Sequence, residues 1–183
     1  SVINLSLTWG NTSDKVAAIN YAASKGAFIV WAGGNDAKAL LSGANTSGLT
    51  ATAISRLILV GSVSPTNTLS SFSNTPGTGG LVSTTNAKTN YSARWIMAPG
   101  QSIIAPYVTA GNNAWGYWTG TSMAAPVISG ALLLLQSAWP ILKTNGTTAN
   151  LLIAAALLAY LTALVLRAIS GGPLTSAGRD YLG

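Results

Sequence analysis

The segment with the clearest chemical character is Gly120-Thr121-Ser122-Met123-Ala124-Ala125-Pro126, in which small residues and hydroxyls precede a long apolar run. This pattern places Ser122 near the first turn of a predicted helix, where backbone N–H groups lack intrahelical partners and the helix dipole favours negative charge. Such donors can stabilise an oxyanion that forms beside a serine nucleophile. Serine is also a common helix N-cap, and these residues alone favour the N-cap interpretation.

The rest of the sequence restricts the chemistry open to Ser122. The 183 residues contain no His and no Cys, which excludes a Ser-His-Asp or Cys-His site within the chain, a histidine general base and an ordinary zinc site. Gly77-Thr78-Gly79-Gly80 neither follows a predicted strand nor opens a helix. We therefore interpret it as a turn and not as a nucleotide-binding loop.

The elements that must position Ser122 follow from the apolar pattern. Four short segments rich in β-formers predict buried strands at 2–7, 27–31, 57–61 and 95–98. Between the first two we expect a helix that Asn11 or Ser13 caps, with Asp14 in its first turn and Gly26 at its end. Continuous apolar strands separated by a helix indicate a parallel sheet. The predicted fold is α/β, a parallel β-sheet with helices on both faces, in one domain over residues 1–183.

Two apolar stretches close the chain. Residues 122–139 predict a largely buried helix that Pro140 ends. Residues 149–170 predict a second apolar helix, whose length approaches that of a membrane span. Because Arg167 lies inside this run, we favour a helix packed on the sheet over contact with a membrane. Residues 64–94, rich in Ser, Thr, Asn, Gly and Pro, predict surface turns and an edge hairpin.

The charge pattern limits the partners. Nine Lys and Arg face three acidic residues, giving a formal charge of +6, yet only 7% of residues are charged. The basic residues are scattered along the sequence, so we expect no nucleic-acid partner. The lack of Cys leaves the cellular compartment open. Because the chain begins inside a predicted buried strand, we expect that a preceding segment is missing or belongs to another chain.

Several blocks resemble one known family. Gly120 to Pro126 is similar to the nucleophile motif of the subtilases, the subtilisin-like serine proteases of the peptidase S8 family. Trp31-Ala32-Gly33-Gly34-Asn35-Asp36 resembles the family's segment with the oxyanion-binding asparagine, and Val2 to Leu7 resembles its substrate-binding strand. Further blocks match in the same order at 59–63, 71–74 and 98–100. The resemblance implies the C-terminal part of a subtilisin-like three-layer sandwich with its N-terminal part missing; residues 135–140 are most similar to the secreted, autotransporter-like bacterial branch.

The resemblance also implies roles for the matching residues. Ser122 would attack the scissile carbonyl, while its own N–H and the Asn35 amide would hold the oxyanion. The backbone of Ser6, Leu7 and Thr8 would bind extended substrate as an added strand. Ala32, Gly33 and Gly34 would leave room for the substrate side chain before the cut. Asn beside Gly is also common in turns, but the carboxyl end of a parallel strand is where open α/β sheets place their sites.

The family's catalytic Asp and His match no residue of this chain, since Asp14 and Asp36 lie outside the family's Asp motif. One hypothesis is a secreted, periplasmic or cell-surface serine endopeptidase acting on polypeptides, whose Asp and His come from an N-terminal segment or a second chain. The other is a catalytically inactive scaffold for assembly or binding. Intact Ser122 and Asn35 favour the enzyme. We predict no cofactor and no metal site in this chain, which lacks an acidic cluster, although calcium could stabilise the complete domain.

Overall fold

A four-stranded parallel sheet forms the centre of the molecule. The computed structural model describes residues 1–7, 12–40, 48–109, 112–144, 148–156 and 158. The sheet has the order β1-β2-β3-β6, and its strands are Val2–Leu5, Phe28–Ala32, Leu57–Val63 and Trp95–Pro99. Each strand pairs in parallel with its neighbour. The four predicted strands are confirmed, with small shifts at their ends.

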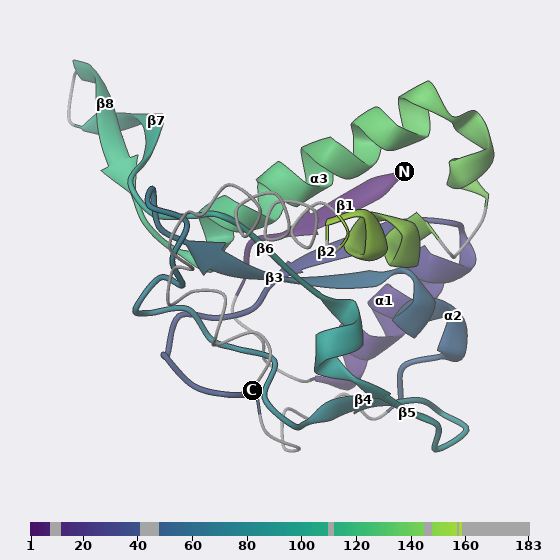
Figure 1. The fold of residues 1–183 in the computed structure, drawn as a ribbon. Helices are drawn as coiled ribbons and strands as arrows, with labels where there is room; N and C mark the ends of the chain where they lie inside the picture. The colour runs from purple at the N-terminus through teal and green to yellow at the C-terminus, as the bar shows by residue number, and fades with distance from the viewer. Residues whose placement is uncertain (8–11, 41–47, 110–111, 145–147, 157, 159–183) are drawn as a thin grey trace, which may run out of the picture.

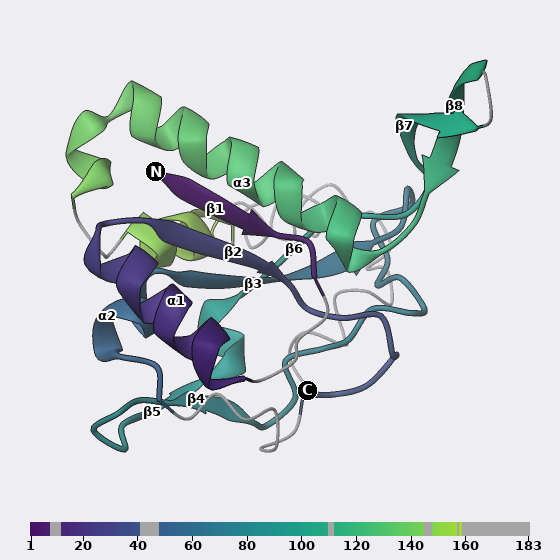
Figure 2. The same cartoon turned by 180° about the vertical axis from the view of Figure 1, so that it is seen from behind.

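Helices cover both faces of this sheet (Figures 1 and 2). The long helix α3 (Thr121–Ala138) lies on one face and contacts all four strands. On the other face, α1 (Ser13–Ser24) packs on β2 and on the short α2 (Ala51–Ser55). The predicted α/β fold with three layers is therefore confirmed.

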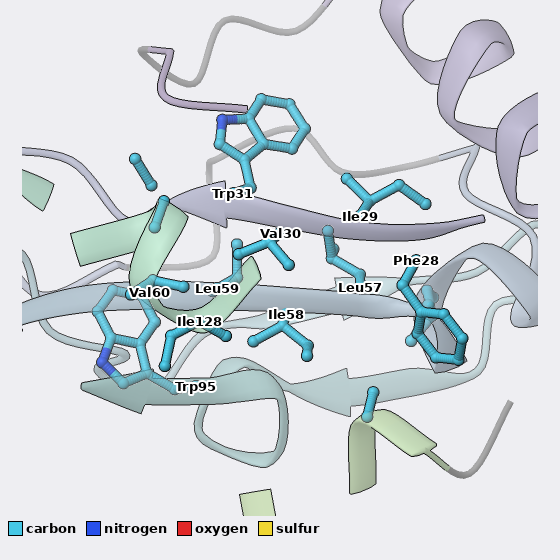
Figure 3. Close-up of a cluster of buried hydrophobic side chains, with 14 of the residues drawn as sticks. Phe28, Ile29, Val30, Trp31, Leu57, Ile58, Leu59, Val60, Trp95 and Ile128 are labelled. Carbon is cyan, nitrogen blue, oxygen red and sulfur yellow. The ribbon is translucent and has the colours of Figure 1, made fainter. Parts of the chain in front are cut away.

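The core explains why the central strands carry continuous apolar runs. Every residue of β2 is buried, and so is β3 up to Ser62. Figure 3 shows their side chains pointing alternately to the two faces, together with Trp95 of β6 and Ile128 of α3. Because helices cover both faces of the sheet, a polar side chain at any position of these strands would be buried. An unbroken apolar sequence is therefore the most stable choice for a central strand. Each fully buried Leu, Ile, Val or Phe contributes about 1.5–3 kcal/mol relative to exposure.

The ends of α1 match the sequence prediction only in part. Its N-cap is Thr12, which makes no side-chain capping bond, and Ser13 is the first helical residue. The prediction of Ser13 as the cap is therefore wrong, and Asn11 lies outside the described residues. At the other end Gly26 adopts φ +82° and its N–H donates to the Ala23 carbonyl at 2.9 Å. A glycine takes this conformation without the penalty that a Cβ would add.

Two small antiparallel pairs extend the body. The pair β4 (Gly80–Val82) and β5 (Lys88–Asn90) forms in the predicted hairpin region, and the 3₁₀ helix η1 (Tyr91–Arg94) follows it. The pair β7 (Ile103–Thr109) and β8 (Asn112–Trp118) was not expected from the sequence. This β7–β8 hairpin projects from the body at the end where α3 begins (Figures 1 and 2).

The end of the described chain is helical. After α3, the 3₁₀ helix η2 (Pro140–Lys143) confirms that Pro140 ends the long helix. Residues 148–156 are helical, and the rest of the predicted helix at 149–170 lies outside the described residues, apart from Leu158. Within the described part, α3 has the length and composition to cross a membrane, but 39% of it is buried inside the fold.

Candidate active site

Ser122 is the second residue of α3 and not its cap. The N-cap is Gly120, and no side chain caps the helix. The interpretation of Ser122 as an N-cap is therefore wrong, although its place at the start of a long helix is confirmed. The backbone N–H of Ser122 has no hydrogen-bond acceptor among the described residues. A free N–H at this end of a helix is suited to bind an anion.

Asn35 lies three residues beyond the carboxyl end of β2 and reaches the same helix start. Its Oδ1 accepts two hydrogen bonds of 2.9 Å from Thr121, one from the backbone N–H and one from the side-chain hydroxyl. The Thr121 Oγ1 in turn accepts from the Gly34 N–H at 3.1 Å. Because Thr121 holds the Oδ1 side of the amide, the Nδ2 group points away from Thr121. Nδ2 has no hydrogen-bond acceptor in the described part of the chain.

The two free donors converge beside Gly120. A Cβ placed on this glycine would stand 3.4 Å from Asn35 Nδ2 and 3.7 Å from the backbone N of Ser122. Both donors therefore border one small space that the lack of a side chain at position 120 leaves open. An oxygen placed between the two nitrogens could accept a hydrogen bond from each, which is the arrangement that stabilises an oxyanion.

The loop that carries Asn35 is held by the buried side chain of Asn74. The Asn74 Nδ2 donates to the Gly33 carbonyl at 3.1 Å, and its Oδ1 accepts from the N–H groups of Asp36 and Lys38, both at 3.0 Å. The Asn74 N–H also donates to the Gly34 carbonyl at 3.0 Å. These bonds fix the backbone on both sides of Asn35. The sequence analysis noted Asn74 only as part of the block at 71–74 that resembles the subtilases. It did not predict that Asn74 or Thr121 holds Asn35 in place.

The end of β1 is tied to Ser122 by a chain of hydrogen bonds. Ser129 Oγ donates to Asn4 Oδ1 at 3.0 Å, and Asn4 Nδ2 donates to Ser6 Oγ at 2.9 Å. Ser6 Oγ then donates to the Ser122 carbonyl at 2.7 Å. The Leu7 carbonyl accepts from the Trp31 indole N–H at 3.2 Å. Of the three residues predicted to bind substrate backbone, Ser6 therefore contacts the candidate nucleophile, Leu7 contacts Trp31, and Thr8 lies outside the described residues.

The three small residues after Trp31 have a packing reason for their size. Ala32 and Gly33 are buried, and a Cβ on Gly33 would overlap the Trp95 ring. Gly34 adopts φ +102°, and a Cβ there would overlap the Asn74 amide. The turn that leads to Asn35 therefore requires both glycines, while their predicted part in a substrate pocket stays a prediction.

This arrangement can hold an oxyanion but has no imidazole to deprotonate Ser122, because the sequence contains no histidine. No group of three or more potential metal ligands occurs among the residues that the structure describes. The chain thus presents a serine and two convergent donors without a general base of the expected kind.

Comparison with known proteins decides the family. A sequence model of the subtilase family matches residues 1–178. The chain belongs to the subtilase family. This subtilase is 33% identical over 157 residues to an extracellular protease of Xanthomonas campestris pv. campestris, covering 82% of this chain and 23% of that protein. It is 35% identical over 137 residues to the major intracellular serine protease of Bacillus subtilis, covering 73% of this chain and 36% of that protein.

A solved structure shares the fold of this chain. Sphericase aligns with a TM-score of 0.55 and 25% identity, over 81% of this chain and 46% of the sphericase chain. This subtilase therefore spans less than half of that structure and about a quarter to a third of the two curated relatives. The relatives include one extracellular and one intracellular enzyme, so family membership alone does not fix the compartment.

Proposed function

We propose that this chain is the serine-bearing part of a subtilisin-type endopeptidase that hydrolyses peptide bonds in polypeptides. Ser122 Oγ attacks the scissile carbonyl carbon, and the resulting oxyanion accepts hydrogen bonds from the Ser122 N–H and Asn35 Nδ2. The backbone of Ser6, Leu7 and Thr8 aligns extended substrate, and Ala32, Gly33 and Gly34 border the side chain before the cut.

The convergence of two unpaired donors beside Gly120 carries this proposal. A structural asparagine would satisfy its amide on both sides, whereas Asn35 is fixed through Oδ1 alone. Holding the amide in place before substrate arrives removes the cost of reorienting it during the reaction, which is how such donors accelerate acyl transfer. A helix that needed only structural stability would gain from a capping side chain at position 120.

The proton of Ser122 needs an acceptor that this chain does not contain. We assign that role to a histidine, oriented by an aspartate, on an N-terminal segment or a second chain. The imidazole takes the Oγ proton as the C–O bond forms and returns it to the leaving amine as the C–N bond breaks. Without this base, a serine site of this design retains only the contributions of the oxyanion donors and of substrate binding.

The proposed function also includes a cellular location and a metal content for the complete protein. We place the complete protein outside the cytoplasm, as a secreted, periplasmic or cell-surface bacterial enzyme, with support from the extracellular relative. Calcium could stabilise the complete domain, and we propose no metal site made by residues of this chain alone.

A fluorophosphonate probe tests the function on the complete polypeptide that the gene encodes. Serine attack displaces fluoride, so a functional site becomes phosphonylated at Ser122, which peptide mass spectrometry locates. Ser122→Ala should abolish labelling, while Ser92→Ala, at an exposed position of η1, should leave it unchanged. No labelling in material that contains the Asp and His motifs would refute the enzyme and favour the alternative, an inactive scaffold for assembly or binding.

A further inference from the structure

Two buried arginines lie at the amino ends of the central strands, at the edge of the sheet opposite the candidate active site. Arg56 directly precedes β3, and Arg94 ends η1 and directly precedes β6. Figure 1 shows α2, which ends next to Arg56, at the end of the body away from the β7–β8 hairpin. Both arginines are 8% exposed, and the described residues place no carboxylate on either guanidinium. Because a buried cation without a counter-charge is costly, each arginine needs a physical reason.

Arg56 has a structural role. Its Nη1 donates to the Gly26 carbonyl at 3.0 Å, and its Nη2 donates to the Thr144 carbonyl at 3.1 Å. The guanidinium carbon also lies 4.8 Å from the centre of the Phe28 ring, which is a cation–π contact. These contacts join the turn after α1, the start of β2 and the end of η2. Arg56 therefore uses both of its Nη groups within the fold, although its Nε has no partner in the described part of the chain.

Arg94 has no comparable set of contacts. Its Nη1 donates to the Ser55 carbonyl at 3.1 Å, which is its only hydrogen bond among the described residues. Its Nε is buried without an acceptor, whereas its Nη2, which also lacks one, keeps contact with solvent. Nε and Nη2 carry the two parallel N–H groups on one edge of a guanidinium, and this edge can hold a carboxylate through two hydrogen bonds. We call this edge the Arg94 fork; one of its donors lies inside the protein and the other at the surface.

The electrostatics at the Arg94 fork favour an anion. Burial lowers the pKa of Arg94 from its ordinary value, because desolvation penalises the charged form, yet an arginine stays protonated at neutral pH. A second cation, Arg56, is anchored on the residue that follows the Ser55 carbonyl. The acidic residues that the structure describes, Asp14 and Asp36, lie in the first turn of α1 and in the loop after β2. The positive charge at the fork is therefore uncompensated by the described residues.

We propose that the Arg94 fork is a binding site for a small carboxylate from solution, and that carboxylate binding stabilises the fold. A carboxylate matches the two parallel N–H groups in shape and cancels the single buried charge. Phosphate also accepts two hydrogen bonds from such an edge, but its further oxygens and second charge would lose water at a residue that is mostly buried. The site does not depend on the proposed peptidase function, because Arg94 lies at the amino ends of the strands, whereas Asn35 follows the carboxyl end of β2.

Urea unfolding in different salts tests the site on the complete encoded polypeptide. All samples carry Ser122→Ala, which prevents self-digestion, and are compared in sodium acetate, sodium phosphate and sodium chloride at equal ionic strength. If acetate binds with a dissociation constant of about 10 mM, about 100 mM acetate lowers the equilibrium constant for unfolding about 10-fold relative to chloride. Arg94→Met, which removes the fork and its charge, should lose this response. Arg94→Lys, which keeps the charge without the paired N–H groups, should lose most of it and keeps the test open if Arg94→Met does not fold.

The control and the outcomes separate a specific site from its alternatives. Lys15→Met removes one charge at an exposed position of α1 and should respond to acetate as the parent protein does. An equal acetate response of the parent and Arg94→Met would assign the effect to general salt action and overturn the site. No response of the parent to acetate would also overturn it; a lower stability of Arg94→Met would then indicate that a carboxylate of the protein itself occupies the fork. Stabilisation by phosphate alone would refute the carboxylate. A saturable response that only Arg94 supports would confirm the site, whatever the result of fluorophosphonate labelling.

Discussion

Replacing Asn35 by aspartate tests the oxyanion donor while changing little else. The carboxylate has the shape of the amide, so one oxygen can keep both 2.9 Å hydrogen bonds from the Thr121 N–H and hydroxyl. The other oxygen replaces Nδ2, the group that would stand 3.4 Å from a Cβ on Gly120. The substitution therefore turns one of the two convergent donors into a negatively charged acceptor that faces the position of the oxyanion.

The expected loss in kcat can be compared with the effect of removing other oxyanion donors. Removing one oxyanion donor lowers kcat by about 10²–10³, or about 2.7–4 kcal/mol, a range known from subtilisin itself and not worked out from this chain. Repulsion between the carboxylate and the oxyanion adds to that loss, so we expect a fall of at least about 10³ in kcat with little change in KM. Unfolding free energy should stay within about 0.5 kcal/mol, because the bonds to Thr121 persist and a carboxylate at a helix start is favourable.

The assay is hydrolysis of a chromogenic peptide by the complete encoded polypeptide, with urea unfolding measured on the same samples. Asn86→Asp is the control, since it makes the same charge change at an exposed turn residue with φ +62°, which Asp also tolerates. If Asn35→Asp keeps kcat within 10-fold of the parent protein while both variants remain folded, Asn35 is not an oxyanion donor. A large fall for Asn86→Asp as well would show a general charge effect and refute the same assignment.

Five further substitutions, grouped in three tests, address the residues that support the site and the helices. Gly130→Ala should raise the unfolding free energy of the chain by about 0.5–1 kcal/mol, since a Cβ there meets no atom within 4 Å. Gly26→Ala is the control: the space is equally open, but the residue has φ +82°, so alanine should lower the unfolding free energy by about 1–2 kcal/mol. Equal effects of the two substitutions in urea melts would contradict this dependence on backbone conformation. Asn74→Ala should cost about 1–3 kcal/mol in the same melts and lower kcat, because it frees the loop around Asn35. Thr121→Val, which removes the hydroxyl but keeps the shape, should lower both stability and kcat, whereas Thr121→Ser should preserve them; indistinguishable kinetics of the two variants would exclude the hydroxyl from positioning Asn35.

The sheet could be predicted because its signal is local. Each central strand is a continuous apolar run, and burial on both faces requires that pattern whatever the neighbours are. The β7–β8 hairpin gave no comparable signal. Its strands contain Pro106 and Gly116 and lack clean alternation, and part of their order comes from a cross-strand contact in which Tyr107 and Trp118 meet edge to face at 6.0 Å. Such pairing depends on register, which composition does not reveal.

The site shows the same division between local and long-range signals. The place of Ser122 at a helix start followed from the small residues before an apolar run, although its exact position in the first turn did not. The partners that fix Asn35 were beyond sequence reasoning, because Thr121 and Asn74 lie 86 and roughly 40 residues away and their bonds depend on how β2, β3 and α3 meet. A polar side chain in a Ser- and Thr-rich loop looks the same in the sequence whether it holds a catalytic turn or faces solvent.

The two halves of the proposed chemistry depend on different folding events. The oxyanion donors are placed by contacts inside this chain, from Thr121 to Asn35 and from Ser6 to Ser122, so they form when the sheet and α3 pack together. Under the proposed function, proton transfer from Ser122 depends instead on the histidine that we assign to an N-terminal segment or a second chain. A molecule without that histidine would hold a formed oxyanion site and still leave the serine proton in place, since preorganised donors do not substitute for a base. On this proposal, the arrival of the base is the step that would give the site peptidase activity.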